Sequence, residues 1–182
     1  MIVPVVVLCM VTLLAMQPIP APKSKVVIGY VGGYKGLVDV GKIKAEKLTH
    51  INYAFVNVKN NRAFLNHEAT DTLNLQRLNQ LKTKNPTLKI LISIGGWAWS
   101  ENFSDAALTD TARKAFAESA VKIIEKYELD GVDVDWEYPA IAGEEGNVYR
   151  PEDKQNFTLM LKALRSELDT LEKNSGKKKL LT

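Results

Sequence analysis

The chain has 182 residues, of which 46% are hydrophobic and 25% are charged, a composition typical of a globular protein with one core. The formal net charge is only +3 at pH 7, and part of it lies in a lysine run at residues 177–179. Such a run favours a solvated tail, so we expect one domain and no nucleic-acid partner.

An apolar segment opens the chain. Residues 2–16 are apolar except for Pro4 and Thr12, a run shorter than the ~20 residues that a membrane-spanning helix needs. We therefore expect residues 1–21, approximately, to be a signal peptide of a secreted (extracellular or periplasmic) protein, and residues 22–182 to form its domain. An uncleaved membrane anchor is the alternative, because no Lys or Arg precedes the run; we expect no membrane contact beyond this leader.

Beyond the leader, short segments rich in β-branched and aromatic residues alternate with longer segments of helical period. This alternation is typical of βαβ units and a parallel sheet. We predict strands at residues 25–31, 50–58, 89–94 and 131–137, and helices at residues 72–84, 112–127 and 151–174. Thr109 or Thr111 can cap the second helix, and proline suits the first turn of the third.

The final residues, 180–182, have the character of a fifth strand. A closed (β/α)₈ barrel usually takes ~250 residues. The predicted fold class is therefore α/β, a (β/α)₈ TIM barrel with only about the first four βα units and the start of strand five present. Such a chain is either a half barrel or a domain truncated at its C-terminal end.

Three carboxylates occupy alternate positions in the fourth predicted strand: Asp133, Asp135 and Glu137. Alternate residues of a strand share a face, so we expect the acids on one face and Trp136 in the core behind them. Carboxylates this close cannot all ionise freely, and at least one pKa should be raised. Glu137, the last of the three and nearest the carboxyl end of the strand, is the predicted general acid.

Two other interpretations of the acids fit less well. A calcium loop requires glycine at its sixth place, where this chain has Tyr138 followed by Pro139. A solvated edge strand would not explain the apolar residues at the alternate positions. We therefore expect neither a metal site nor a cofactor.

Residues 130–139, DGVDVDWEYP, match without a departure the DGxDxDWEYP signature of glycoside hydrolase family 18. Other segments agree with that family in order and spacing: residues 28–30, 53–55, 93–97 and 151–157. The chain resembles the N-terminal part of the catalytic domain of this chitinase-like family, over essentially its whole length after the leader.

The resemblance implies a TIM barrel that hydrolyses β-1,4-linked N-acetylglucosamine polymers, with chitin or chito-oligosaccharides as the binding partner. It also implies substrate-assisted retaining catalysis, in which the acetamido oxygen of the substrate attacks the anomeric carbon. On this mechanism Glu137 donates the proton and Asp135 holds the acetamido group. Asp133 accepts the proton that Asp135 turns away, and Tyr138 matches a substrate-contacting tyrosine beside the acid.

Residues at the other strand ends complete the implied substrate groove. Tyr30, Phe55 and Trp97 match family positions that floor or wall the groove, and aromatic faces suit the C–H-rich faces of sugar rings. Core packing is the alternative for each of them. Gly95 and Gly96 are expected to form a turn that lets the backbone approach the groove.

Two other functions share these features. The family also uses a Met-x-Tyr-Asp segment of strand six and a tryptophan of strand eight, which do not occur in these 182 residues. An inactive fragment, or a chitin- or oligosaccharide-binding protein, is therefore one alternative, although the presence of Glu137 favours an enzyme. An endo-β-N-acetylglucosaminidase, which shares the acidic motif, is the other. Nothing in the sequence indicates an oligomeric state.

Overall fold

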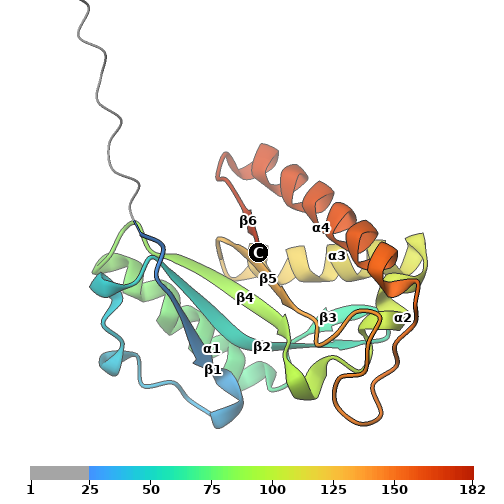
Figure 1. Ribbon diagram of the computed structural model, residues 1–182. Helices are drawn as coiled ribbons and strands as arrows, with labels where there is room; N and C mark the ends of the chain where they lie inside the picture. Colours follow the sequence, from blue (N-terminus) through green and yellow to red (C-terminus); the bar gives the residue numbers. More distant parts are fainter. Residues whose placement is uncertain (1–24) are drawn as a thin grey trace, which may run out of the picture.

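A six-stranded sheet forms the centre of the molecule, of which the computed structural model describes residues 25–182 (Figure 1). Five strands are parallel and lie in chain order: β1 (Ile28–Gly32), β2 (His50–Lys59), β4 (Lys89–Gly95), β5 (Gly131–Asp135) and β6 (Leu180–Leu181). The short β3 (Arg62–Phe64) pairs antiparallel with the end of β2. The predicted leader, residues 1–21, lies outside the described residues.

Helices connect the parallel strands. They are α1 (Glu68–Gln80), α2 (Phe103–Leu108), α3 (Asp110–Lys126) and α4 (Asp153–Ser175), while three short 3₁₀ turns link β1 to β2. Because spatial order follows chain order, the described residues are the first four βα units of a (β/α)₈ barrel and the start of its fifth strand. The predicted fold class is confirmed. No helix between residues 25 and 182 is long and apolar enough to cross a membrane.

The element boundaries differ from the predicted ones in informative places. Helix α1 begins at Glu68, four residues before the predicted start, because the buried Asp71 accepts hydrogen bonds from the Tyr53 hydroxyl (2.6 Å) and the His67 backbone N–H (2.9 Å). The β2–β3 hairpin and the six-residue α2 were not predicted. Both are too short for a periodic pattern, which needs a window of about 11 residues.

Strand β5 ends at Asp135, two residues before the predicted end. The predicted placement of Glu137 on the strand is therefore wrong: this residue lies in the loop that follows. Helix α4 likewise begins at Asp153, so Pro151 precedes it. By contrast, the predicted cap of α3 is confirmed, since Thr109 Oγ1 accepts a hydrogen bond of 3.1 Å from the Ala112 backbone N–H.

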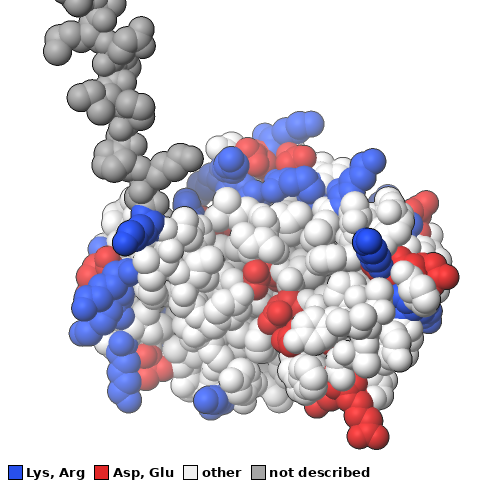
Figure 2. All heavy atoms as spheres, in the orientation of Figure 1, with Lys and Arg blue, Asp and Glu red and all other residues white. Residues whose placement is uncertain are grey.

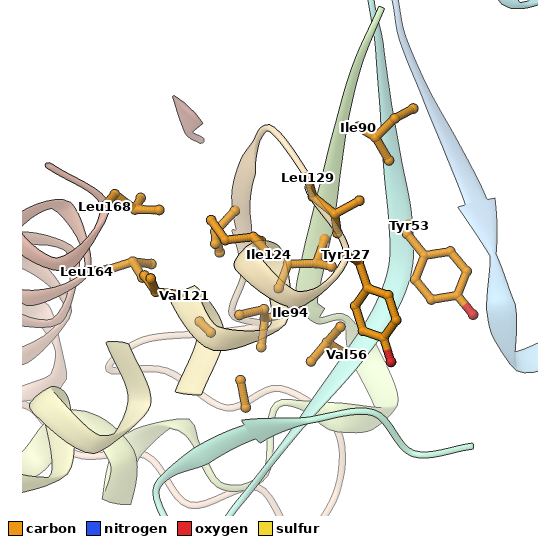
Figure 3. Packing of buried hydrophobic residues seen from close by; sticks show 14 of the residues in the cluster. Tyr53, Val56, Ile90, Ile94, Val121, Ile124, Tyr127, Leu129, Leu164 and Leu168 are labelled. Carbon is orange, nitrogen blue, oxygen red and sulfur yellow. The ribbon is translucent and has the colours of Figure 1, made fainter. Parts of the chain in front are cut away.

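The helix-facing side of the sheet is apolar, and one hydrophobic core fills the space between sheet and helices (Figure 3). Side chains that point this way alternate along each strand, and the fully buried ones include Ile51, Tyr53, Ile90, Ile92, Ile94 and Val132. They meet Ile124 of α3 and Leu164 and Leu168 of α4. Trp136 is also in this core, as predicted, with its ring stacked on Phe103 at 5.3 Å.

The opposite side of the sheet carries the polar residues. Register pairs Tyr30 with Asn52, Ser93 with Asp133 and Gly95 with Asp135 across neighbouring strands. Figure 2 shows acidic atoms over β5 in the middle of a face of mostly uncharged atoms, with basic and further acidic side chains around its rim. The centre of this face thus carries acidic groups alone.

Candidate active site

Asp133 lies at the centre of a set of hydroxyl groups on the polar side of the sheet. Its Oδ2 accepts hydrogen bonds from Ser93 Oγ of β4 (2.7 Å) and from Tyr30 Oη of β1 (2.9 Å). Its Oδ1 accepts one from Thr182 Oγ1 beside β6 (2.8 Å). Both carboxyl oxygens of Asp133 are therefore occupied by hydroxyl donors from three different strands or strand ends.

Asp135 is the acid with the raised pKa. Partial burial is the main cause, followed by the negative charges of Glu137 and then of Asp133. A raised pKa was expected among the three acids from crowding; the residue concerned is the middle one, and burial contributes more than the neighbouring charges. Asp135 keeps a proton to a higher pH than an ordinary aspartic acid, which lets its carboxyl group donate a hydrogen bond.

Glu137 is held through its backbone beyond the end of the strand. Its N–H donates a 2.9 Å hydrogen bond to Ser100 Oγ, and its C=O accepts a 3.3 Å bond from Asn147 Nδ2. Its carboxylate lies close to the Tyr138 hydroxyl and is the main reason why the pKa of Tyr138 is raised. Although Glu137 is not on β5, its charge still acts on Asp135, so the three acids lie together.

The two predicted aromatic residues nearest Glu137 are open to solvent. Tyr138 is 42% exposed and Trp97 is 51% exposed, and their rings meet edge to face with centroids 6.4 Å apart. Tyr30 is 57% exposed, although its hydroxyl binds Asp133. In residues 25–182 neither Tyr30 nor Trp97 is packed in the hydrophobic core, and their contact with sugar stays a prediction.

Phe55 borders an apolar hollow beside the acids. The hollow measures about 320 Å³ and is lined by Tyr34, Phe55, Gly95, Trp97, Ala98 and Trp99. The rings of Tyr34 and Phe55 stack with an interplanar angle of 8°. Four aromatic side chains around one opening suit the apolar faces of sugar rings. A larger hollow of about 500 Å³, on the outside of α1 and α3, shares no residue with the acids.

Gly95, the last residue of β4, and Gly96, which follows it, allow a close approach of main chains. Gly95 and Gly96 have φ angles of +110° and +81°, which favour glycine. A Cβ atom on Gly95 would lie 2.3 Å from the Asp135 carbonyl oxygen, and one on Gly96 would lie 2.8 Å from the Phe55 ring. The turn therefore packs directly against β5, and its contact with substrate stays a prediction.

Several residues of the site were missed from the sequence. Ser93 had a signal, because it shares the polar face of β4 with Gly95 at period two. Tyr34 and Trp99 carry no signal in the sequence other than their aromatic side chains. Ser100 and Asn147 meet Glu137 only through the folding of two loops. In residues 25–182, no three His, Cys, Asp or Glu side chains are grouped so as to hold a metal ion.

Comparisons with known proteins identify the family of the chain. The family model described as "Glycosyl hydrolases family 18" matches residues 26–182. Chitinase A1 of Niallia circulans is 38% identical over 218 aligned positions, which cover 92% of this chain and 31% of that protein. The chain therefore spans about a third of the length of this relative.

Solved structures give the same result. Chitinase ChiA74 from Bacillus thuringiensis superimposes with a TM-score of 0.80 at 34% identity, over 87% of this chain and 35% of the other. A glycoside hydrolase family 18 N-acetylglucosaminidase from Paenibacillus barengoltzii gives a TM-score of 0.76 at 44% identity, over 87% of this chain and 44% of the other. With its family model matched from β1 to β6, the chain belongs to glycosyl hydrolase family 18.

Proposed function

We propose that this chain contributes the acid–base centre of a chitinase, which hydrolyses β-1,4-linked N-acetylglucosamine polymers with retention of configuration. The observation that carries the proposal is the division of roles among the three acids. Asp133 is saturated with hydroxyl donors, whereas the pKa of its neighbour Asp135 is raised beside Glu137. An acid with a raised pKa beside other carboxylates is characteristic of acid–base sites.

The proposed reaction has two steps. First, Glu137 gives its proton to the glycosidic oxygen while the acetamido oxygen of the same sugar bonds to the anomeric carbon, so that the bond to the leaving sugar breaks and an oxazolinium ion forms. Water then attacks the anomeric carbon, the bond to the acetamido oxygen breaks, and the Glu137 carboxylate takes a proton from that water. Two inversions at one carbon give net retention.

In this scheme a carboxyl oxygen of Asp135 accepts a hydrogen bond from the acetamido N–H, which holds the group in place and leaves its carbonyl oxygen free to attack the anomeric carbon. The raised pKa of Asp135 supports a proton shared with its neighbours, because only a protonated carboxyl can donate a hydrogen bond to another acid. Asp133 is the negative neighbour that accepts the proton when Asp135 turns away. The hydroxyl groups of Ser93 and Tyr30 keep Asp133 in place during this exchange.

Chitin or a chito-oligosaccharide is the proposed substrate because of the aromatic residues beside the acids. Trp97, Tyr138 and Tyr30 are exposed, and Phe55 borders the apolar hollow. Relatives of this chain are named chitinases. The N-acetylglucosaminidase of Paenibacillus barengoltzii supports a second candidate, an N-acetylglucosaminidase that acts on other glycans.

Turnover of a chromogenic chitobiose substrate tests the proposal. We would assay the chain alone and a chimera in which the remaining segments of Chitinase A1 of Niallia circulans are joined to it. We expect turnover by the chimera, and loss of turnover with retained oligosaccharide binding on Glu137→Gln. Hydrolysis by the Glu137→Gln chimera would overturn the assignment of the acid. Products from chitin, compared with those from a glycoprotein glycan, distinguish the two candidate substrates.

We also propose that the protein is secreted. The support is the apolar run of residues 2–16 followed by a proline-rich stretch. Expression with its own N-terminus and mass spectrometry of the exported protein test this. A mature chain that begins near residue 22 would support cleavage, whereas an intact Met1 in the membrane fraction would favour the anchor.

A further inference from the structure

A buried hydroxyl lies behind the proposed proton donor. Ser100 follows the 3₁₀ turn Trp97–Trp99 and has no exposed surface. Its Oγ accepts the hydrogen bond of the Glu137 N–H (2.9 Å) and donates to the Gly96 C=O (2.9 Å), with the Asp135 C=O 3.3 Å away. One hydroxyl therefore connects the end of β5 to the glycine turn that follows β4.

The hydrogen bond between Ser100 and Glu137 takes the place of the strand hydrogen bonds, which end at Asp135. Residues 131–135 are fixed by hydrogen bonds to the neighbouring strands, including the bond from the Gly96 N–H to the Asp135 C=O (2.8 Å). Glu137 lies outside this ladder. In the described residues, the backbone N–H of Glu137 donates to the Ser100 hydroxyl. This hydrogen bond therefore fixes the main chain at Glu137, where the strand pairing has already ended.

The other side of the Glu137 backbone is enclosed as well. Asn147 Nδ2 donates to the Glu137 C=O (3.3 Å). A Cβ atom on Gly143 would lie 2.1 Å from that same oxygen, so the loop after Glu137 approaches it with its main chain. The N–H and C=O groups of Glu137 thus each have a side-chain partner from a different loop.

We propose that Ser100, with Asn147 on the opposite side, is a positioning residue that sets the place of the Glu137 carboxyl group. Rotation of the Glu137 backbone by loss of either bond moves the carboxyl relative to Asp135 and to a bound glycosidic oxygen. Displacement of a reacting group by 1 Å costs up to about 100-fold in rate. Ser100 itself is buried beneath the acid and touches its backbone, so it acts through Glu137.

The inference rests on the proposed role of Glu137, but its first test requires no turnover. Because the nearby Glu137 carboxylate is the main cause of the raised pKa of Tyr138, this pKa reports where the carboxyl lies. We would label tyrosine at ¹³Cζ, assign the Tyr138 signal with Tyr138→Phe, and titrate the 182-residue chain by NMR. Ser100→Ala should move the Tyr138 pKa down toward the ordinary value of about 10, and Asn147→Ala should move it in the same direction.

Ser119 provides a matched control. It is also a buried serine whose Oγ connects backbone groups, accepting from the Ala63 N–H (2.9 Å) and donating to the Phe116 C=O (2.8 Å), far from the acids. Ser119→Ala should lower the unfolding temperature about as much as Ser100→Ala but leave the Tyr138 pKa unchanged. Ser100→Thr, which keeps a hydroxyl, should restore the pKa of the original chain.

The second test is kinetic and uses the chimera. Ser100→Ala should lower kcat by about 10- to 100-fold with little change in KM, and Ser100→Thr should recover most of the loss. An unchanged Tyr138 pKa in both Ser100→Ala and Asn147→Ala would overturn the inference, whatever the activity. A shifted pKa in a chimera that never turns over would instead support the positioning and reject the proposed function.

Discussion

Ser93 and Asp133 are register partners on the neighbouring strands β4 and β5, and the Ser93 hydroxyl donates a 2.7 Å hydrogen bond to Asp133 Oδ2. Ser93 has no exposed surface, and Asp133 is 8% exposed. The bond therefore orients the carboxylate at the base of the acid group, shielded from competition by water. Loss of this hydrogen bond should therefore affect both the fold and the position of Asp133.

Removal of the Ser93 hydroxyl should weaken both the fold and the chemistry. Ser93→Ala deletes one of three donors to Asp133, and we expect a loss of about 1 kcal/mol in the free energy of unfolding, measured with urea. In the chimera, kcat should fall by about 10-fold, less than the 10²- to 10⁴-fold that a general acid contributes. Ser119→Ala is again the control, and an unchanged kcat in Ser93→Ala would contradict the positioning of Asp133.

The raised pKa of Asp135 makes a prediction about pH. A carboxyl with a raised folded-state pKa binds its proton more tightly in the folded chain, so its contribution to stability is present at low pH and is lost as pH rises through that pKa. Asp135→Asn, which cannot ionise, should therefore be more stable than the original chain at pH 7. Thermal unfolding from pH 3 to pH 7 checks this.

The difference between the two chains should shrink as pH falls toward 3.8, the ordinary value for this group. Equal stability of Asp135→Asn and the original chain at pH 7 would show that the folded state does not disfavour the ionised form of Asp135. Glu128→Gln, on the surface after α3, is a suitable control for the loss of one negative charge.

Two glycines with positive φ angles should respond differently to alanine. Gly95 (φ +110°) would place its Cβ atom against the Asp135 carbonyl oxygen, whereas Gly146 (φ +92°) has nothing within 4 Å of that position. Gly146→Ala should cost only the backbone strain, about 1 to 3 kcal/mol. Gly95→Ala should cost clearly more, because a main-chain oxygen cannot rotate away. Urea unfolding of both variants measures the difference, and equal losses would contradict the close packing.

Asp130 offsets the positive charge of a cluster of lysines at the amino ends of the strands. Asp130 binds Lys82 (2.6 Å) and Lys89 (3.6 Å) and accepts the Ile90 N–H (2.8 Å). Nearby, burial lowers the pKa of Lys179, whose ammonium group donates to the Leu129 C=O. Asp130→Asn leaves these positive charges together, and we expect a loss of about 1.5 to 3 kcal/mol in urea unfolding.

Part of that loss is repulsion between lysines, so it should be smaller in 1 M salt than in 0.1 M salt, where the screening length is about 3 Å instead of about 10 Å. Asp39→Asn, which breaks an exposed ion pair with Lys42, should change stability by less than about 1 kcal/mol at either concentration. Activity of the chimera should not change with Asp130→Asn if this end of the barrel serves stability alone.

Long buried strands were predictable and short elements were not. The predicted strands at residues 50–58 and 89–94 agree with β2 and β4 to within one residue, because continuous runs of buried aliphatic side chains identify strands of a parallel sheet. Strand β3 has three residues and α2 has six. They form because the β2 ladder and the core near Phe103 support them, which no local pattern reveals.

The order of the strands, the alternation of acids and apolar residues and the family signature were contained in the sequence by itself. Period two assigns Asp133 and Asp135 to one face of β5, but it does not say which groups of other strands meet them. Tyr30 and Thr182, 103 and 49 residues away, reach Asp133 only when the parallel strands align. Likewise, the placement of Glu137 off the strand depends on Ser100, 37 residues before it. Such contacts are decided by the tertiary structure, because a hydrogen bond depends on the distance between two atoms and not on their separation along the chain.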